Sequence, residues 1–366
     1  MTDPRLERMA QVIVDYSIQV RAGQLVLITS EPAGLGLACL VYRQALAAQA
    51  HPYVRVILPD LEALLLSQGS DDQVSYVSEI DRLEVEQADA RVVVRAPENT
   101  RVLAGIDPSR LALARRARQP LFNRLLERKA RGELATCLTQ YPTAAAAQEA
   151  GMSLVNYEDF VFRACFCDQE NPVQAWQELS REQQGYVNFL NTVRELVVEA
   201  PDTELKLSVA GRRWINSDGR ANFPSGEVFT GPVEDSAEGH IRLDVPTPFS
   251  GHDVEGIELR FQAGRVVAAR AERGTDFLVS TLDTDPGARV LGEFAFGLNY
   301  RIDRPTRNIL FDEKIGGTIH LAVGSGYPET GSTNRSAIHW DMIKNMKTGR
   351  VLADGRTVYE NGRFKL

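Results

Sequence analysis

The sequence predicts an α/β protein of two domains, with a mainly parallel sheet in the N-terminal α/β domain and a β-rich α+β C-terminal domain. Its 366 residues exceed what one ordinary hydrophobic core accommodates. Up to about residue 195, short apolar runs alternate with helical patterns, and beyond it β-type runs are separated by Gly, Pro and Asp. We therefore expect one domain over residues 1–195 and a second over residues 196–366.

Strand and helix patterns alternate through the first half of the chain. The strand-like runs are "QLVLIT", "YVRVILP", "ARVVVRAP" and "ATCLTQYP". Helical patterns lie between them, in "GLGLACLVYRQALAAQA" and over about residues 108–131. Asp3 followed by Pro4 is typical of a helix start, since Asp caps the free N–H groups and Pro suits the first turn. This alternation predicts a parallel sheet covered on both faces.

After about residue 200 the pattern becomes that of strands and hairpins. The runs are "ELKLSVAG", "GHIRLDVP", "DVEGIELRF", "RVVAARAE", "LGEFAFGLN" and "TIHLAVG". One segment, "GTDFLVSTLDTD", reads as a helix. We place the domain boundary within 185–203, where a long helical pattern gives way to "APDTEL".

Composition narrows the class of protein. A net charge of −8 argues against a nucleic-acid-binding face. The longest apolar runs are far shorter than the roughly 18 residues of a membrane helix, and the opening "MTDPRLERMAQ" has no secretory apolar region. Four scattered cysteines suggest no disulfide framework. We expect a cytoplasmic protein that binds neither nucleic acid nor membrane.

The turn "EPAGLGLAC" has part of a dinucleotide-binding pattern. Gly34 and Gly36 match, but Cys39 stands where a third small residue belongs. We favour the interpretation that this turn lets a helix pack closely on a strand.

The short run "IHWDM" raises a question about metal binding. His339 and Asp341 are two residues apart, so on an extended strand they share a face, about 6.6 Å apart along it. Such a pair by itself is more often a hydrogen-bonded surface pair than part of a metal site. The interpretation therefore depends on partners elsewhere in the chain.

Three other residues of the second half offer such partners. His320 ends "GGTIH", Glu227 lies in "NFPSGEVFTGP", and Glu293 is a lone acid in the apolar run "RVLGEFAFGLN". Burying an unpaired carboxylate is costly, so each glutamate needs a cation or hydrogen-bond donors, and an ordinary ion pair explains either one alone. With the "IHWDM" pair they make three carboxylates and two imidazoles, a set suited to two divalent first-row cations.

At this point the sequence resembles a known family. The motifs "FPSGEVFTGP", "ARVLGEFAFGLN", "LFDEKIGGTIHLAVGSGY" and "NRSAIHWDMI" are similar, in order, to those of the aminopeptidase T (M29) metallopeptidases, over most of residues 195–345. The resemblance implies a homodimeric aminopeptidase that removes N-terminal residues from peptides with a free N-terminus. It implies an N-terminal α/β domain and a C-terminal domain that carries the site.

The resemblance also implies roles for individual residues. Those that match metal ligands are Glu227, Glu293, His320, His339 and Asp341. They would hold two divalent ions (Zn, Co or Mn) that activate a water molecule. Tyr327 matches a catalytic tyrosine, and we place Glu293 beside the water as a catalytic group as well. Glu313 is either an acid or base near the metals or an ordinary surface acid.

One departure and one rival interpretation remain. Residues 321–338 leave only 18 positions between the two histidines, fewer than is usual in the family, which bears on the substrate pocket. The rival is a mononuclear non-haem iron ring-cleaving dioxygenase on the same scaffold, since His320, His339 and Asp341 form a two-histidine, one-carboxylate set. Glu227 and Glu293 favour two metals, because a mononuclear site does not need them. A catalytically silent binding protein is a third interpretation.

Overall fold

The computed structural model describes residues 3–366, which form two compact units. The first comprises residues up to Gln174 together with Gly219–Pro224, and the second comprises Ala175–Asp218 and Ser225–Leu366. The units therefore divide about 20 residues before the expected boundary at 195. The reason is helix α9 (Pro172–Leu190), whose Val187 and Leu190 belong to the hydrophobic core of the second unit.

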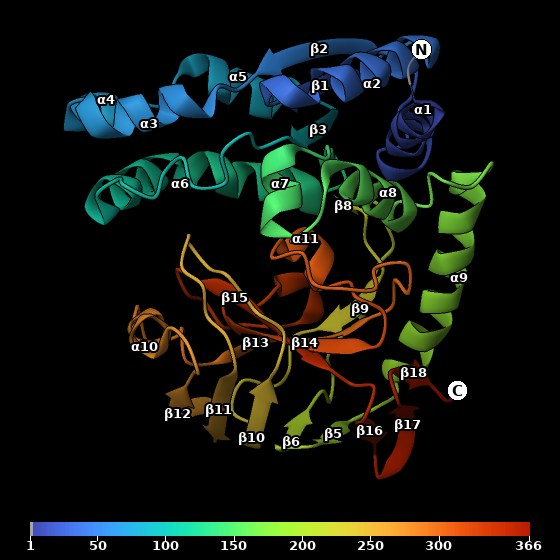
Figure 1. Ribbon diagram of the computed structural model, residues 1–366, viewed down its shortest axis with the longest axis vertical. Coiled ribbons are helices and arrows are strands. Elements are labelled where there is room, and N and C mark those ends of the chain that lie inside the picture. Colours follow the sequence, from blue (N-terminus) through green and yellow to red (C-terminus); the bar gives the residue numbers. More distant parts are fainter. Residues whose placement is uncertain (1–2) are drawn as a thin grey trace. The chain divides into compact units, whose positions relative to one another are not determined.

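The first unit is built on a five-stranded parallel sheet with the order β2-β1-β3-β4-β8 (Figure 1). Its strands are β1 (Leu25–Ser30), β2 (His51–Val56), β3 (Ala90–Arg95), β4 (Ala135–Gln140) and β8 (Asn222–Phe223). Its helices are α1 (Pro4–Gln11), η1 (Val12–Ser17), η2 (Pro32–Gly34), α2 (Leu35–Ala47), α3 (Pro59–Gln68), α4 (Asp71–Ser75), α5 (Glu79–Gln87), α6 (Pro108–Ala130), α7 (Ala144–Glu149) and α8 (Leu154–Ala164). Asp3 caps α1 as expected, accepting a hydrogen bond from the Arg5 backbone N–H at 2.8 Å.

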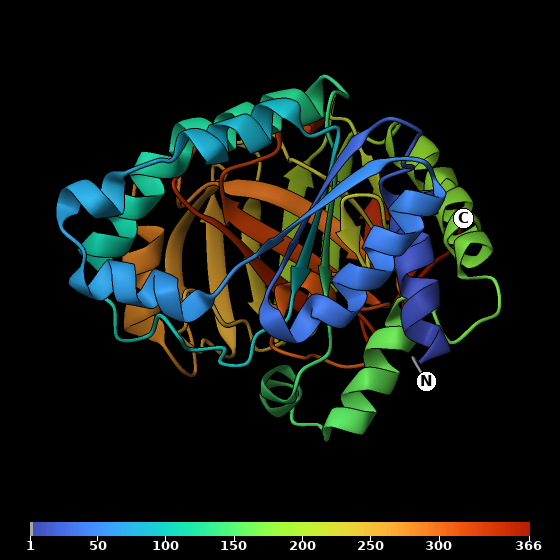
Figure 2. The same ribbon diagram turned by 90° about the horizontal axis from the view of Figure 1, so that it is seen from above.

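Helices cover both faces of this sheet (Figure 2). On one face, Leu27 and Leu134 pack with Ala88 and Leu125, which follow α5 and lie in α6 respectively. At the turn before α2, a Cβ on Gly34 would lie 2.8 Å from side-chain atoms of both Ser30 and Val94. This glycine is therefore explained by close packing, and the dinucleotide interpretation is not needed.

The second unit contains two sheets packed face to face (Figure 1). The larger has the order β12-β11-β10-β6-β5-β16-β17-β18, with β5 (Glu195–Ala200), β6 (Thr203–Ser208), β10 (Glu238–Leu243), β11 (Ile257–Gln262), β12 (Arg265–Arg270), β16 (Arg350–Ala353), β17 (Arg356–Glu360) and β18 (Arg363–Phe364). The smaller has the order β15-β14-β13-β9-β7, with β7 (Ile215–Ser217), β9 (Glu227–Thr230), β13 (Leu291–Gly297), β14 (Thr318–Gly324) and β15 (His339–Asn345). Besides α9, the unit has the short helices α10 (Thr275–Leu282), α11 (Ile309–Asp312) and η3 (Pro328–Thr330).

These elements confirm the fold class expected from the sequence: an α/β part with a parallel sheet and a β-rich part with antiparallel sheets. The core between the two sheets is rich in aromatic rings. The Trp214 ring stacks on Phe296 at 5.9 Å between centroids, and Phe296 also meets Tyr359 at 5.0 Å. Within residues 3–366, none of the helices is both long enough and apolar enough to cross a membrane.

A single extra residue in β13 decides which way its side chains face. Leu291 pairs with Val323, but Glu293 pairs with Ala322, so Gly292 is inserted as a β-bulge. In a regular strand, residues two apart share a face. Because of the bulge, Leu291 joins Val323 in the core, whereas Glu293 lies on the opposite face with Ala322.

We predict that Gly292→Ala destabilises the second unit by about 1–3 kcal/mol, the usual cost of forcing extra atoms into a packed site. A Cβ there would lie 2.5 Å from the Gly324 carbonyl oxygen and 2.7 Å from that of Ser325, both backbone atoms. Urea unfolding followed by tryptophan fluorescence measures this, because the three tryptophans (Trp176, Trp214 and Trp340) all lie in the second unit.

Gly185→Ala in α9 is the matched control. A Cβ at that position meets no atom within 4 Å, so the helix should gain about 1 kcal/mol. An unchanged unfolding midpoint for Gly292→Ala would show that the bulge accepts a side chain and is not constrained as described.

Candidate metal centre

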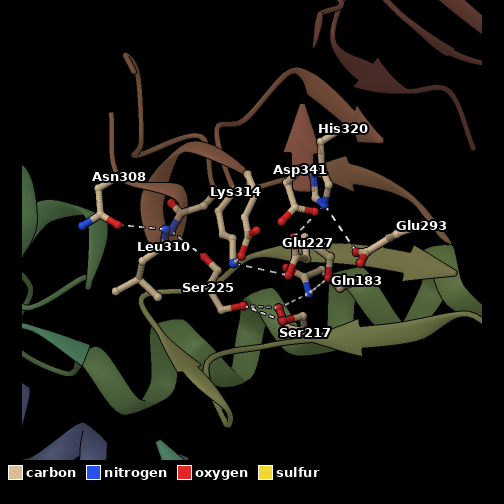
Figure 3. Close-up of polar contacts among 12 residues, drawn as sticks. Gln183, Ser217, Ser225, Glu227, Glu293, Asn308, Leu310, Lys314, His320 and Asp341 are labelled. Atoms are coloured by element: carbon tan, nitrogen blue, oxygen red, sulfur yellow. Dashed lines mark hydrogen bonds and ion pairs between the residues drawn. The ribbon is translucent and has the colours of Figure 1, made fainter. Parts of the chain in front are cut away.

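The five predicted side chains lie together on one face of the smaller sheet, and Figure 3 shows four of them, Glu227, Glu293, His320 and Asp341. They come from four neighbouring strands and are Glu227 (β9), Glu293 (β13), His320 (β14), His339 and Asp341 (β15). We call them the carboxylate–histidine cluster. The intervening residues, such as Phe294, Leu321 and Trp340, belong to the core on the opposite face. Two-residue alternation thus separates charge from core in three adjacent strands.

Small residues share the face of the cluster. Ala295 pairs with His320, and Ala322 pairs with both Asp341 and Glu293. Because each alanine ends at Cβ, the longer side chains on neighbouring strands have room to converge above it.

Each functional group of the cluster lies within 3.6 Å of at least one other, so that the five form a connected set. His320 Nε2 lies 3.6 Å from Glu227 Oε2 and 3.4 Å from Glu293 Oε1. His339 Nε2 lies 3.4 Å from Glu293 Oε2 and 3.4 Å from Asp341 Oδ1. Glu293 therefore stands between the histidines, with one oxygen facing each ring.

A backbone carbonyl sets the orientation of the His339 ring. Nδ1 lies 2.7 Å from the Ser325 oxygen, so this nitrogen carries the proton and donates it. In the neutral ring, Nε2 then keeps its lone pair on the side of Glu293 and Asp341. A metal-binding histidine is commonly held in this way through its second nitrogen.

Two consecutive residues, Glu313 and Lys314, lie beside the carboxylate–histidine cluster. They add one acid and one lysine to it. Lys314 is fully buried, and its Nζ lies 3.5 Å from Glu227 Oε1 and in close contact with Glu313 (Figure 3). The sequence pattern points to Glu313 only as an acid near the metals or at the surface, and it gives no signal for Lys314. The segment "FDEK" has no strand alternation, so nothing in it indicates that this lysine turns inward.

Burial and mutual charge shift the protonation of the cluster. Burial raises the pKa of Glu227, against the opposing charges of Lys314 and His320. Burial also acts to raise the pKa of Asp341, but the charge of His339 outweighs it and lowers the pKa to about 2. Burial acts to lower the pKa of His339, and the Asp341 charge overcomes it, so that this pKa is well above its usual value. Without a bound cation, the neighbouring carboxylates thus favour the protonated form of the His339 imidazole.

Tyr327 lies beside the cluster, in the loop between β14 and β15. Its ring meets the edge of His339 at 5.1 Å between centroids and tilts against Phe229 at 5.4 Å. The residue as a whole is 40% exposed. Burial of part of the ring, then the charges of Glu293 and Asp341, raise the pKa of Tyr327 well above its usual value. The phenol therefore stays protonated at neutral pH and can donate a hydrogen bond.

Several buried atoms of the cluster have no hydrogen-bond partner among the described residues: Glu227 Oε2, His320 Nδ1 and Asp341 Oδ1. Buried polar atoms without partners are uncommon in folded proteins, and a bound ion can supply the partner that the chain does not. Ligand-type atoms gather in two overlapping sets, each within 4.8 Å: Glu293, His339 and Asp341, and Glu313, His320 and Asp341. The donors are nitrogen and oxygen throughout, which fits divalent first-row metals.

Comparisons with known proteins agree with this geometry. The family model described as thermophilic metalloprotease (M29) matches residues 2–364. Aminopeptidase T of Thermus thermophilus is 30% identical over 356 residues, covering 88% of this chain and 85% of that protein. The solved structure of wild-type AmpT from Thermus thermophilus superposes with a TM-score of 0.86 at 25% identity, covering 99% of each chain.

A second solved structure shares the fold at lower similarity. The 2,5-dihydroxypyridine dioxygenase from Pseudomonas putida has a TM-score of 0.59 and 15% identity, covering all of this chain and 98% of that one. At this identity the likeness shows the fold alone. The family model, in contrast, matches almost the whole chain. The chain therefore belongs to the M29 metalloprotease family, the aminopeptidase T family of hydrolases.

Proposed function

We propose that this chain is a metal-dependent aminopeptidase that removes N-terminal residues from peptides with a free N-terminus, using two divalent ions. The observation that carries the proposal is the pair of overlapping ligand sets that share Asp341. One mononuclear site needs only one such set. Family membership supports the reaction class, and the sequence resemblance supports the substrate class.

The carboxylate–histidine cluster would hold the ions. Its donors suit Zn, Co or Mn, and its carboxylates together with Glu313 far outweigh the single charge of Lys314. Glu293 would be a ligand at the centre of the cluster, because its two oxygens face different histidines at 3.4 Å each. The geometry also makes Glu313 a candidate ligand in the set with His320, alongside Glu227.

When bound, the ions would polarise the peptide carbonyl and lower the pKa of a water molecule towards neutrality. Glu293 would orient that water and accept a hydrogen bond from it. His339 is already fixed by the Ser325 carbonyl, so its ring needs no reorientation when the substrate binds.

Tyr327 would act on the substrate's carbonyl oxygen. Its hydroxyl is protonated at neutral pH, and the ring is positioned against His339 and Phe229. A phenol in this position donates a hydrogen bond that strengthens as negative charge develops on the oxygen in the transition state. We therefore propose Tyr327 as the residue that stabilises the oxyanion.

Two further expectations are part of the same proposal: a homodimer, which the family resemblance implies, and a cytoplasmic location, which the composition suggests. The rival function is ring cleavage by a single iron held by His320, His339 and Asp341. The dioxygenase with the same fold is the reason to test this rival function. The two functions differ in their need for Glu227 and Glu293, which gives the decisive experiment.

We predict that Glu227→Gln and Glu293→Gln each lose bound metal and reduce peptide turnover by at least ~100-fold, about 2.7 kcal/mol of transition-state stabilisation. The amide keeps the size of the side chain but removes an anionic ligand. Metal content by mass spectrometry and release of amino acids from a dipeptide panel measure the two effects. Glu204→Gln, an exposed acid in β6, is the matched control and should change neither.

The opposite result would identify the oxygenase. In that case both variants would keep one iron and most of an oxygen-consuming activity on a dihydroxylated aromatic compound. Wild-type protein that consumes oxygen with such a compound, and releases no amino acid with Zn, Co or Mn, would exclude the aminopeptidase.

We further predict that Tyr327→Phe lowers kcat by about 10²–10³, the typical loss when one oxyanion donor is removed. Metal content should stay unchanged, because the Tyr327 phenol stays protonated at neutral pH and is not one of the proposed ligands. Tyr76→Phe, at an exposed position of the first unit, is the control. A wild-type kcat in Tyr327→Phe would remove this residue from the mechanism.

Removing the metal should abolish amino-acid release reversibly. A strong chelator withdraws the ions, and adding back Zn, Co or Mn to the desalted protein should restore activity. Circular dichroism before and after treatment distinguishes loss of metal from loss of fold. Activity that persists in a protein shown to be metal-free would contradict the proposal.

A further inference from the structure

A cavity with charged walls lies in the first unit, beneath helices α5 and α6. Its volume is about 90 Å³. Leucines form much of its wall, among them Leu27, Leu121, Leu125 and Leu134. The family motifs of the sequence lie in the second half of the chain, so nothing in the proposed function uses this cavity.

Strand register places an arginine among these leucines. Arg91 of β3 pairs with Leu27 of β1, so the two side chains share one face of the parallel sheet. The next residue, Val92, faces the opposite side and is fully buried. Arg91 therefore enters the cavity from its floor, and its Nε is buried.

The acids of the cavity already have a partner. Arg55 Nη1 lies 2.6 Å from Asp81 Oδ1 and 2.5 Å from Glu84 Oε2. Within residues 3–366, Arg91 Nε and Glu84 Oε1 are both buried without a hydrogen-bond partner. Burial lowers the pKa of Arg91, with only partial compensation from the charge of Glu84. One cationic donor and one anionic acceptor of the cavity wall thus lack a hydrogen-bond partner among the described residues.

We propose that this cavity binds a small apolar α-amino acid as its zwitterion, with the carboxylate on Arg91, the ammonium group on Glu84 and the aliphatic side chain against the leucines. An arginine binds a carboxylate through two parallel N–H bonds, which suits a free guanidinium. At about 30 Å³ of liquid volume per water, a cavity of about 90 Å³ corresponds to roughly three waters, so the ligand must be a small amino acid that stays partly exposed at the mouth of the cavity, and L-valine is the probe.

Amino-acid binding at this cavity is independent of the proposed function, although free amino acids are also the products of an aminopeptidase. The test therefore measures binding, without any peptide. It also includes a variant of the carboxylate–histidine cluster, so that binding of an amino acid at that cluster is recognised.

The experiment is calorimetric titration of L-valine into the full chain, up to about 20 mM ligand, which detects millimolar affinity. We expect one valine per chain in wild-type protein and in Glu293→Gln. Arg91→Leu and Glu84→Gln should each weaken binding at least about tenfold, and Arg91→Lys should weaken it less than Arg91→Leu because it keeps the charge. Arg82→Leu, exposed on α5, should bind like wild type.

Two analogues test the two ends of the ligand. 3-Methylbutanoate lacks the ammonium group and isobutylamine lacks the carboxylate, and each should bind at least about tenfold more weakly than valine. Circular dichroism verifies the fold of every variant, and Arg91→Lys provides the test if Arg91→Leu does not fold. Four results would each overturn the proposal: no valine binding, equal binding by both Arg91 variants and wild type, equal binding of 3-methylbutanoate, or loss of the site in Glu293→Gln.

Discussion

One inserted glycine determines the chemistry of the second unit. Strand β13 must place Leu291 in the core and Glu293 in the carboxylate–histidine cluster, although the two are only two residues apart. A regular strand cannot do both, since alternate side chains share a face. The bulge at Gly292 resolves the conflict, and its lack of a side chain is required by the carbonyl groups of Gly324 and Ser325.

The cluster itself combines charges that would be unfavourable one at a time. Each buried carboxylate has a cationic or imidazole neighbour: Lys314 for Glu227, and the histidines for Glu293 and Asp341. Lys314 is buried completely, and its Nζ lies 3.5 Å from Glu227 Oε1. The remaining negative charge is what suits the cluster to divalent ions.

Much of this arrangement could be predicted from the sequence. The apolar runs located the strands of both units, and the chemical rarity of an acid such as Glu293 in an apolar run pointed to the site. The bulge could not be predicted, because the spacing of Leu291 and Glu293 suggests a shared face. Lys314 and Glu313 were not placed, because they follow the short helix α11 and belong to no periodic pattern.

Long-range packing was the other feature that could not be predicted from the sequence. An amphipathic helix such as α9 has one apolar face, but its sequence does not say which of two cores receives that face. Strand β8 has only two residues, Asn222 and Phe223, too few for any alternation, yet it joins the sheet of the first unit. The boundary between the units therefore follows from packing and not from local pattern.

The loop between β14 and β15 has a consequence for how such a chain varies over evolution. Its base is fastened by Asn334, whose side-chain nitrogen donates to the carbonyls of Gly287 and Gly324, and by Asp285, which accepts from Ser336 and Ala337. Insertions or deletions between Gly324 and Asn334 leave unchanged the strand pairing that aligns His320 with His339 and Asp341. A single-residue insertion or deletion within either strand, in contrast, moves the side chains that follow it to the opposite face of the sheet. The loop that carries Tyr327 can therefore be lengthened or trimmed to suit new ligands, while the strands around it can change only by substitution.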